Sequence, residues 1–223
     1  SQLAVESEGG PSRVLITDLD SERLESVREK LEQKAAAKGV ELQTLNPKSF
    51  DSEEGFNQAV RDFAPHGFDD IIMLVPVVPV LNSAVPMLAD NGVMNIFAGI
   101  PAGEEATLNV GDLVHRGVRF IGSSGSRTHH LRHVVEMVEE GKLQPATALA
   151  AIGGMKSLWE GINGVAEGRY PGKTVILPHC EDMPLVPVSE IRKLGEDFNA
   201  TLDEEGHVTL ETEKAIMRKY TNT

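Results

Sequence analysis

Along most of the chain, short apolar runs alternate with apolar positions at helical spacing. Residues 14–17 and 70–75 are predicted strands, because residues 14–17 and 71–75 are continuous runs rich in apolar or β-branched side chains, which is typical of strands covered on both faces of a sheet. Residues 40–45 alternate between apolar and polar positions and predict another strand. Between residues 14–17 and 40–45, the helical positions expected to face inward are Leu24, Val27, Leu31 and Ala35. Gly39 follows them where a helix C-terminal cap belongs.

The alternation continues toward the C-terminus. Further strands are predicted at residues 93–98, 118–122 and 174–177, and further helices at residues 84–89, 131–138 and 157–167. Asp51 and Glu54 have capping-box spacing ahead of another helix, whose expected inward positions are Phe56, Val60 and Phe63. The helix at 84–89 is expected to stop at Asn91-Gly92. Strands that alternate with helices require βαβ crossovers, so we predict an α/β protein with a doubly wound, mostly parallel sheet.

The two ends of the chain differ from this pattern. Residues 1–8 read as the tail of a helix that Gly9-Gly10-Pro11 closes, and eight residues are marginal for an independent helix. We therefore expect a further segment upstream. Beyond Pro178 the chain is rich in proline and charge and ends in a helix at about 209–219. Residues 1–178 are predicted to form the α/β domain, and residues 179–223 an appendage outside the sheet.

Composition narrows the classes of partner. Asp and Glu number 34 and Lys and Arg 21, so the formal net charge is −13. A chain that negative has no general attraction for nucleic acid or anionic lipid, and neither is expected as a partner. No run approaches the roughly 18 apolar residues of a membrane span. The single cysteine, Cys180, excludes an internal disulfide and an all-cysteine zinc site within the chain. These features predict a cytoplasmic protein.

Asp18 is the most informative polar residue, because it lies directly after a predicted strand and before a helix. In a dinucleotide-binding sheet, a carboxylate at the end of the second strand accepts hydrogen bonds from the adenosine ribose hydroxyls. It also repels a 2′-phosphate and so favours NAD over NADP. Arg23 is close enough along the helix to help enclose the adenosine. Alternatively, Asp18 or Asp20 simply caps the helix that begins near Ser21.

The usual partner of such a carboxylate is missing. A G-x-G-x-x-G turn should lie about 20 residues upstream, and only seventeen residues precede Asp18. The expected sheet therefore lacks its first strand and its glycine-rich loop. In the strand order 3-2-1-4-5-6, that strand is central, and its loss leaves its neighbours about 9.5 Å apart. Residues 14–17 must then pair directly with residues 71–75, or a strand from another molecule must fill the gap.

Other candidate residues carry weaker signals. Gly99-Ile100-Pro101 and residues 122–125 follow predicted strands, where glycine permits close approach to a ligand but is also common in ordinary turns. His129, His130 and His133 are the type of residue that binds zinc, yet a solvated helix face is the favoured interpretation. Glu181 and Asp182 should raise the thiol pKa of Cys180, so a nucleophilic role is not expected there. No catalytic residue and no metal ligand is assigned.

Three segments taken together resemble the zinc-type medium-chain dehydrogenase/reductase family: residues 17–24 (TDLDSERL), 92–99 (GVMNIFAG) and 170–178 (YPGKTVILP). Three shorter stretches fit in the same order: residues 68–70, 117–122 and 138–143. The match covers roughly residues 10–178. The tail from Pro184 to Tyr220 looks most like bacterial relatives acting on sugar phosphates or polyols, such as sorbose-1-phosphate reductases.

The resemblance implies roles for particular residues. Asp18 would hold the adenosine ribose with Arg23 beside it, and Val75 and Val77 would follow the strand that leads to the nicotinamide ribose. Gly99, Ile100 and Ile121 would line the nicotinamide pocket, and Lys173 would reach a cofactor phosphate. The implied activity is hydride transfer between the carbon of a small alcohol or polyol and NAD, with zinc polarising the oxygen.

The resemblance also sets limits. The family's zinc ligands and proton relay belong to an N-terminal domain that this sequence does not contain, so the chain alone should be inactive. A homodimer or tetramer is expected, assembled through the edge strand at residues 118–121. Two alternatives stay open: a zinc-independent NADP-linked quinone or enoyl reductase of the same superfamily, and a nucleotide-binding module without catalysis.

Overall fold

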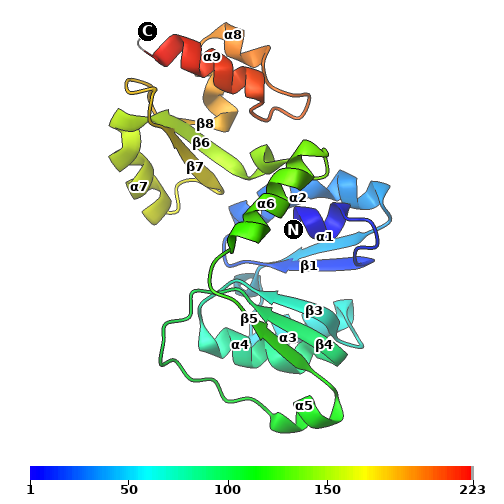
Figure 1. Cartoon of the computed structure of the whole chain (residues 1–223). Coiled ribbons are helices and arrows are strands. Elements are labelled where there is room, and N and C mark those ends of the chain that lie inside the picture. The colour runs from blue at the N-terminus through cyan, green and yellow to red at the C-terminus, as the bar shows by residue number, and fades with distance from the viewer. Residues whose placement is uncertain (222–223) are drawn as a thin grey trace. The chain divides into compact units, whose positions relative to one another are not determined.

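A computed structural model of the chain describes residues 1–221. The chain divides into two compact units, which are described separately (Figure 1). The first contains residues 1–46 and the chain from Met137 onward, and the second contains residues 47–136. Among the described residues, no helix combines the length and apolarity that crossing a membrane demands. The predicted cytoplasmic location and the predicted boundary after Pro178 stay predictions.

The N-terminal part of the first unit is a small α/β layer. Its elements are α1 (Gln2–Glu6), β1 (Arg13–Thr17), α2 (Ser21–Ala37) and β2 (Glu41–Leu45). β1 and β2 are parallel, with Arg13 opposite Glu41 and Thr17 opposite Leu45. Helix α2 buries Leu31 and Ala35 against Val5 of α1. Gly39 has a φ of +69° directly after α2, where the predicted cap requires a left-handed residue. The predicted elements of this part are confirmed.

The second unit contains a three-stranded parallel sheet in the order β3-β4-β5. Its elements are η1 (Pro47–Ser49), α3 (Glu53–Phe63), β3 (Phe68–Met73), α4 (Val78–Ala84), η2 (Val85–Met87), β4 (Leu88–Ile96), α5 (Val110–His115), β5 (Arg119–Gly122) and most of α6 (Thr128–Glu139). The core is formed by Met73, Leu81, Val85, Leu88, Met94 and Val118. The predicted mostly parallel α/β character is therefore observed.

Three local predictions for this unit are wrong. The residue that caps α3 is Ser52, whose Oγ accepts from the Gly55 N–H at 3.1 Å, and not Asp51. The helix expected at 84–89 lies earlier, at Val78–Ala84, because Leu88 already pairs with Phe68 in the sheet. The Asn91-Gly92 turn lies within β4, where a register shift against β3 absorbs it; Asn91 has a φ of +64°.

The exposure of β3 differs from that expected of a strand covered on both faces. β3 ends at Met73, and the side chains of Ile72 and Leu74 are 63% and 64% exposed. β1 pairs with β2 and β3 with β4, in separate sheets of the described residues. Of the two predicted ways of closing the gap, direct pairing of residues 14–17 with residues 71–75 is not among the strand pairs of the described residues, and a strand from another molecule stays a prediction.

The C-terminal part of the first unit contains a second small sheet, in the order β7-β6-β8. Its elements are η3 (Pro145–Ala148), β6 (Leu149–Gly154), η4 (Met155–Ser157), α7 (Leu158–Ala166), β7 (Lys173–Leu177), β8 (Val186–Pro187), η5 (Val188–Leu194), α8 (Glu196–Asn199) and α9 (Leu210–Tyr220). β7 is parallel to β6, and β8 is antiparallel to it. The expectation that the segment after Pro178 stays outside a sheet is wrong, because β8 pairs with β6.

The segment after Pro178 also supplies most of a hydrophobic core. The buried residues that pack with Ile152 of β6 are Cys180, Met183, Val186, Ile191, Leu194, Phe198 and Ile216. We expect Ile216→Ala to lower the free energy of unfolding by about 2–5 kcal/mol and Ile216→Val by about 1 kcal/mol, because the side chain of Ile216 is fully buried. Urea denaturation measures both, and equal small losses in the two variants would contradict this packing.

A charged cluster links the loop before α9 to α1 and α2. Lys34 lies 3.5 Å from Glu6 and 3.1 Å from Glu205, and His207 Nδ1 lies 3.0 Å from Asp203 Oδ2. Burial acts to raise the pKa of the Asp203 carboxyl, but hydrogen bonds from the His207 backbone and ring and the attraction of the His207 charge outweigh it, so the pKa is lowered.

A lowered carboxyl pKa stabilises the folded chain above the unfolded-state pKa, about 3.9, and this stabilisation is lost as the pH falls through the folded-state value. Asp203→Asn should therefore be less stable than the parent at pH 7 and lose less stability between pH 5 and pH 2. Urea unfolding across this range tests the expectation. Parallel pH profiles for parent and variant would show that Asp203 contributes nothing to the acid sensitivity.

Candidate functional site

A short turn after β1 carries the carboxylates singled out in the sequence. The Asp18 N–H continues the strand ladder to the Leu45 carbonyl oxygen at 3.4 Å. The chain then bends, and Asp18 Oδ1 accepts from the Asp20 N–H at 3.0 Å. Asp20 Oδ1 accepts from the N–H groups of Glu22 and Arg23 at 3.0 and 3.1 Å and so caps α2. Asp20 is therefore the residue that caps α2, and the Asp18 carboxylate does not bond to the N–H groups of the helix.

Arg23 closes this turn from the first turn of α2. Its Nη1 lies 2.8 Å from Asp18 Oδ2, and its Nη2 lies 3.5 Å from Asp20 Oδ2. The side chain of Asp18 is 26% exposed. A carboxylate has about four acceptor sites, so both oxygens of Asp18 retain capacity for a further donor. This half-buried, oriented carboxylate fits the two hydroxyls of a ribose. The structure brings Asp18 and Arg23 together, while their roles stay predictions.

Asn46, directly after β2, is a residue that the sequence interpretation missed. Its Nδ2 donates to the Leu19 carbonyl oxygen at 3.2 Å and to Ser21 Oγ at 2.7 Å. The signal available in the sequence was its place directly after a predicted strand and before Pro47, where asparagine favours local side-chain hydrogen bonds.

The second unit gathers the remaining apolar candidates at one edge of its sheet. The Phe97 N–H donates to the Met73 carbonyl oxygen at 2.9 Å, and the Ser123 N–H donates to the Ile96 carbonyl oxygen at 3.2 Å, so the carboxyl ends of the three strands are aligned. The candidates that lie in β5 or in the loops after β3 and β4 are Val75, Val77, Gly99, Ile100 and Ile121.

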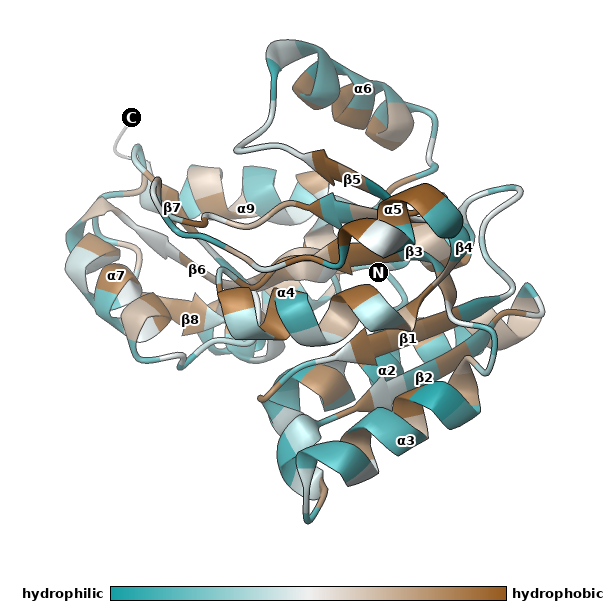
Figure 2. Ribbon diagram, turned by 90° about the horizontal axis from the view of Figure 1, so that it is seen from below, coloured by the Kyte–Doolittle hydropathy of each residue, from teal (hydrophilic) through white to brown (hydrophobic). Residues whose placement is uncertain are grey.

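The surface at this edge is apolar and open. Val75, Val77 and Ile121 are 46%, 42% and 55% exposed, and Figure 2 colours much of β3 and β5 as hydrophobic. A Cβ added at Gly99 would meet no atom of the described chain within 4 Å. Exposed apolar side chains beside open backbone are the features that a flat aromatic ring contacts, and the predicted place of the nicotinamide at this edge stays a prediction.

Lys173 lies elsewhere in the fold. It is the first residue of β7, opposite Leu149 of β6, and so belongs to a different sheet from both Asp18 and the edge after β3. Among residues 1–221, no hydrogen bond or ion pair joins Lys173 to Asp18. Its predicted contact with a cofactor phosphate stays a prediction.

The described residues hold no group of three or more His, Cys, Asp or Glu suited to a metal ion. His129 and His130 lie on α6 with their ring centroids 4.1 Å apart, and His133 faces Glu136 at 3.7 Å. The thiol of Cys180 is buried, and burial, followed by the charge of Glu213, raises its pKa. The predicted direction is confirmed, although the prediction named Glu181 and Asp182 as the cause.

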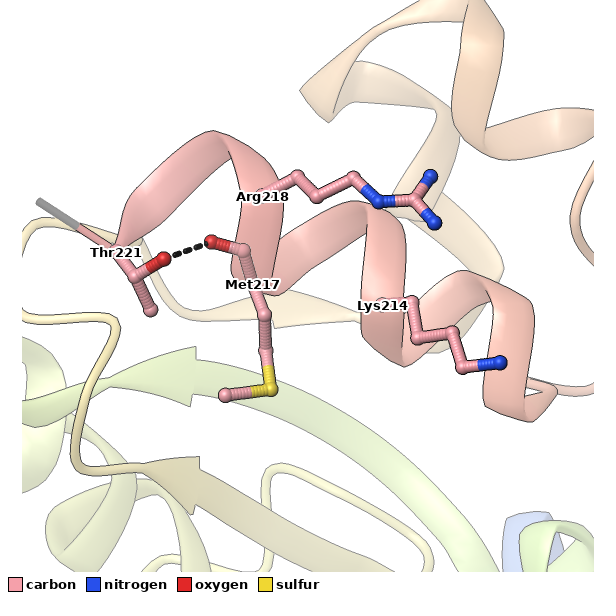
Figure 3. A pocket seen from close by; sticks show the side chains of 4 residues that line it. All are labelled: Lys214, Met217, Arg218 and Thr221. Atoms are coloured by element: carbon pink, nitrogen blue, oxygen red, sulfur yellow. Dashed lines mark hydrogen bonds between the residues drawn. The ribbon is translucent and has the colours of Figure 1, made fainter. Parts of the chain in front are cut away.

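A pocket of about 470 Å³ lies beside α9 (Figure 3). It is lined by Lys214, Met217, Arg218 and Thr221. Thr221 Oγ1 donates to the Met217 carbonyl oxygen, and Lys214 pairs with Glu211 at 2.7 Å. None of the residues singled out in the sequence lines it, so we do not assign the cofactor there.

Residues 2–140 match a protein family described as zinc-binding dehydrogenase. Among curated proteins, the chain is 29% identical over 188 residues to an uncharacterized protein, YggP, of Escherichia coli, covering 83% of the chain and 43% of the relative. It is 27% identical over 221 residues to mannitol-1-phosphate 5-dehydrogenase of Aliivibrio fischeri, covering 94% and 51%. It is 31% identical over 134 residues to L-sorbose 1-phosphate reductase of Klebsiella pneumoniae, covering 56% and 30%.

Solved structures share the fold. A 2R,3R-butanediol dehydrogenase from Bacillus subtilis matches with a TM-score of 0.58 at 16% identity, covering 76% of this chain and 44% of that one. A zinc-binding dehydrogenase from Sinorhizobium meliloti, solved bound to NADP, matches with a TM-score of 0.54 at 17% identity, covering 76% and 46%. The chain spans about half the length, or less, of the curated relatives it matches.

Proposed function

The chain belongs to the zinc-binding dehydrogenase family, and we propose that it is the cofactor-binding portion of an NAD-linked alcohol or polyol dehydrogenase. The observation that carries this proposal is the turn after β1. There Asp20 caps α2, and Asp18 holds a half-buried carboxylate beside Arg23. Asp18 would accept hydrogen bonds from the adenosine ribose hydroxyls, and Arg23 would enclose the adenosine.

The charges of this turn support NAD over NADP. A 2′-phosphate would bring a strong negative charge toward Asp18 and Asp20. Arg23 is already paired with both carboxylates, at 2.8 and 3.5 Å. The alternative, a zinc-independent NADP-linked quinone or enoyl reductase, would need cations free to bind that phosphate. This alternative stays open, because one structure of similar fold was solved bound to NADP. A nucleotide-binding module without catalysis is the second alternative that stays open.

The sheet edge of the second unit would receive the other end of the cofactor. Val75 and Val77 would lie beside the nicotinamide ribose, with Gly99, Ile100 and Ile121 against the ring, which their apolar surface would shield from water. Bound there, the nicotinamide would accept or donate a hydride. Lys173 would contact a cofactor phosphate.

We further propose that β1 and β3 flank a central parallel strand that a longer polypeptide supplies together with the glycine-rich loop. Two of the three sheets of the described residues support this, because β2-β1 and β3-β4-β5 match the strand orders 3-2 and 4-5-6 on either side of the first strand in the order 3-2-1-4-5-6. Zinc ligands and the proton relay would also lie in that polypeptide, since the residues described here do not fit a metal. The 223-residue chain alone would then be inactive.

We also propose that the protein associates with a second copy of itself. β5 pairs with β4 on one side, and the topology gives it no second strand neighbour among the described residues. Such an edge strand can pair with the same strand of a second copy. A homodimer or a tetramer would follow, and light scattering of the purified full-length protein measures it.

The activity test uses the product of the whole reading frame that contains this chain. We expect it to reduce NAD in the presence of a polyol or polyol phosphate, with a zinc chelator lowering the rate by at least tenfold and added zinc restoring it. The 223-residue chain is the matched control and should show no turnover. Preferred use of NADP with an enone or quinone, unaffected by the chelator, would contradict the proposal.

A further inference from the structure

We infer that Asn46 is a positioning residue for the ribose turn, defined as residues 18–21. This inference rests on the proposed function, because it concerns how the turn presents the Asp18 carboxylate to a nucleotide. Asn46 would touch no ligand. It would act by fixing the turn against the end of β2.

The hydrogen bonds within and around the ribose turn fall into two sets. One set is local and joins Asp18 to Asp20 and to Arg23, and Asp20 to the first turn of α2. These bonds determine the shape of the turn. The other set joins the turn to Leu45, the last residue of β2, and to Asn46, which follows it. The Asp18 N–H donates to the Leu45 carbonyl oxygen, and Asn46 Nδ2 donates to the Leu19 carbonyl oxygen and to Ser21 Oγ.

The Asn46 amide braces the turn at two points. Its Nδ2 has two protons, and its partners are the carbonyl oxygen of Leu19, at the middle of the turn, and Ser21 Oγ, on the first residue of α2. The hydrogen bond from the Asp18 N–H to the Leu45 carbonyl oxygen is longer, at 3.4 Å, than the two hydrogen bonds that Asn46 Nδ2 donates, at 3.2 and 2.7 Å. Removing the Asn46 amide would leave the hydrogen bonds within the turn in place, but the turn would lose its two shortest hydrogen bonds to the end of β2.

Loss of the Asn46 amide should lower nucleotide affinity, because the Asp18 carboxylate would no longer be preorganised for the ribose. A carboxylate that must be ordered on binding gives a weaker complex than one already in place. The change should be largest for ligands that use the ribose diol and small for ligands that lack it. A purely structural role for Asn46 would instead lower stability and leave nucleotide discrimination unchanged.

The test compares two nucleotides that differ at the ribose, 5′-AMP and adenosine 2′,5′-bisphosphate, titrated calorimetrically into the product of the whole reading frame that contains this chain. Wild type should bind 5′-AMP more tightly. Asn46→Ala should weaken 5′-AMP binding by about fivefold and reduce its preference over the bisphosphate by a similar factor. Asn46→Asp keeps the size of the side chain but removes its N–H donors, so it should behave like Asn46→Ala. Ser21→Ala should give a smaller loss of 5′-AMP affinity.

The matched control is Asn109→Ala. Asn109, a residue of the other unit, caps α5 by accepting from the Gly111 N–H at 3.0 Å, so its replacement removes an asparagine side-chain hydrogen bond that does not belong to the ribose turn. The control should leave 5′-AMP affinity unchanged. Wild-type affinity and preference in both Asn46 variants would overturn the inference.

Hydrogen exchange gives a readout that does not depend on ligand. The Asp20 and Glu22 amides should exchange about tenfold faster in Asn46→Asp than in wild type, because the turn opens more often. Unchanged exchange would overturn the inference, even in variants that bind weakly. If wild type binds neither nucleotide, the proposed function fails, and the exchange rates still decide whether Asn46 holds the turn.

Discussion

Replacing Asp18 by alanine is expected to weaken NAD binding by at least tenfold and to abolish the preference for NAD over NADP. The carboxylate would accept the ribose hydroxyls from a half-buried position, and hydrogen bonds to a charged group contribute about 1.5–3 kcal/mol each. Its removal also deletes the negative charge nearest to the position that a 2′-phosphate would occupy. Titration of NADH, followed by its fluorescence, into the full-length product measures the loss.

Asp20→Asn is the matched control for this variant. Asparagine caps helices about as well as aspartate, so α2 should stay intact while one of the two carboxylate charges of the turn is removed. NADH affinity should change by less than about threefold, since Asp20 makes no proposed contact with the ribose. Equal losses in the two variants, or no loss in Asp18→Ala, would contradict the assigned role of Asp18.

Replacing Gly154 by alanine is expected to lower the free energy of unfolding by about 3–5 kcal/mol. A Cβ at this position would lie 1.7 Å from the Cys180 carbonyl oxygen and 3.0 Å from the Met183 Cβ. The first of these is backbone, which cannot yield as a flexible side chain would, and the Gly154 N–H already donates to the Met183 carbonyl oxygen at 3.0 Å. The substitution should therefore separate β6 from the segment after Pro178.

Gly55→Ala is the control for this substitution. Gly55 lies in the first turn of α3, and a Cβ there would meet Ser52 Oγ at 3.5 Å, an ordinary contact. It should be neutral or stabilising by up to about 1 kcal/mol, because alanine favours the helix. Urea denaturation compares the two. A Gly154→Ala protein as stable as wild type would show that the segment after Pro178 does not pack on β6 as described.

Elements governed by local signals were predictable from the sequence. β1 follows from its apolar run, and α2 follows from the spacing of Leu24, Leu31 and Ala35 and from the left-handed Gly39 behind it. Each of these signals acts within a few residues, so neighbouring positions suffice to detect it.

Elements governed by distant pairing were not predictable. β6 reads LAAIGG, which has one β-branched residue and ends in two glycines that suit a turn. It is a strand because β7 and β8 pair with it and because Gly153 and Gly154 leave room for the backbone of residues 180–185. The role of the segment after Pro178 depends on the same contacts, and the turn signal at Asn91-Gly92 is overridden by the register between β3 and β4.

The candidate site shows the same division. The sequence left open whether Asp18 or Asp20 caps α2, and the structure separates the two, since only the Asp20 side chain accepts from the N–H groups at the start of the helix. Asn46 lies 25 residues from Ser21 and 27 residues from Leu19, so these two contacts depend on the parallel pairing of β1 and β2. Tertiary pairing of this kind carries no local signal.

The central claim is that the turn after β1 grips the adenosine ribose of NAD once the surrounding sheet is complete. Calorimetric titration of NAD, and separately of NADP, into the product of the whole reading frame tests it most directly. The account predicts saturable binding of NAD at least tenfold tighter than that of NADP, given the two carboxylates of the turn. Heats indistinguishable from dilution for both nucleotides, or tighter binding of NADP, would contradict it.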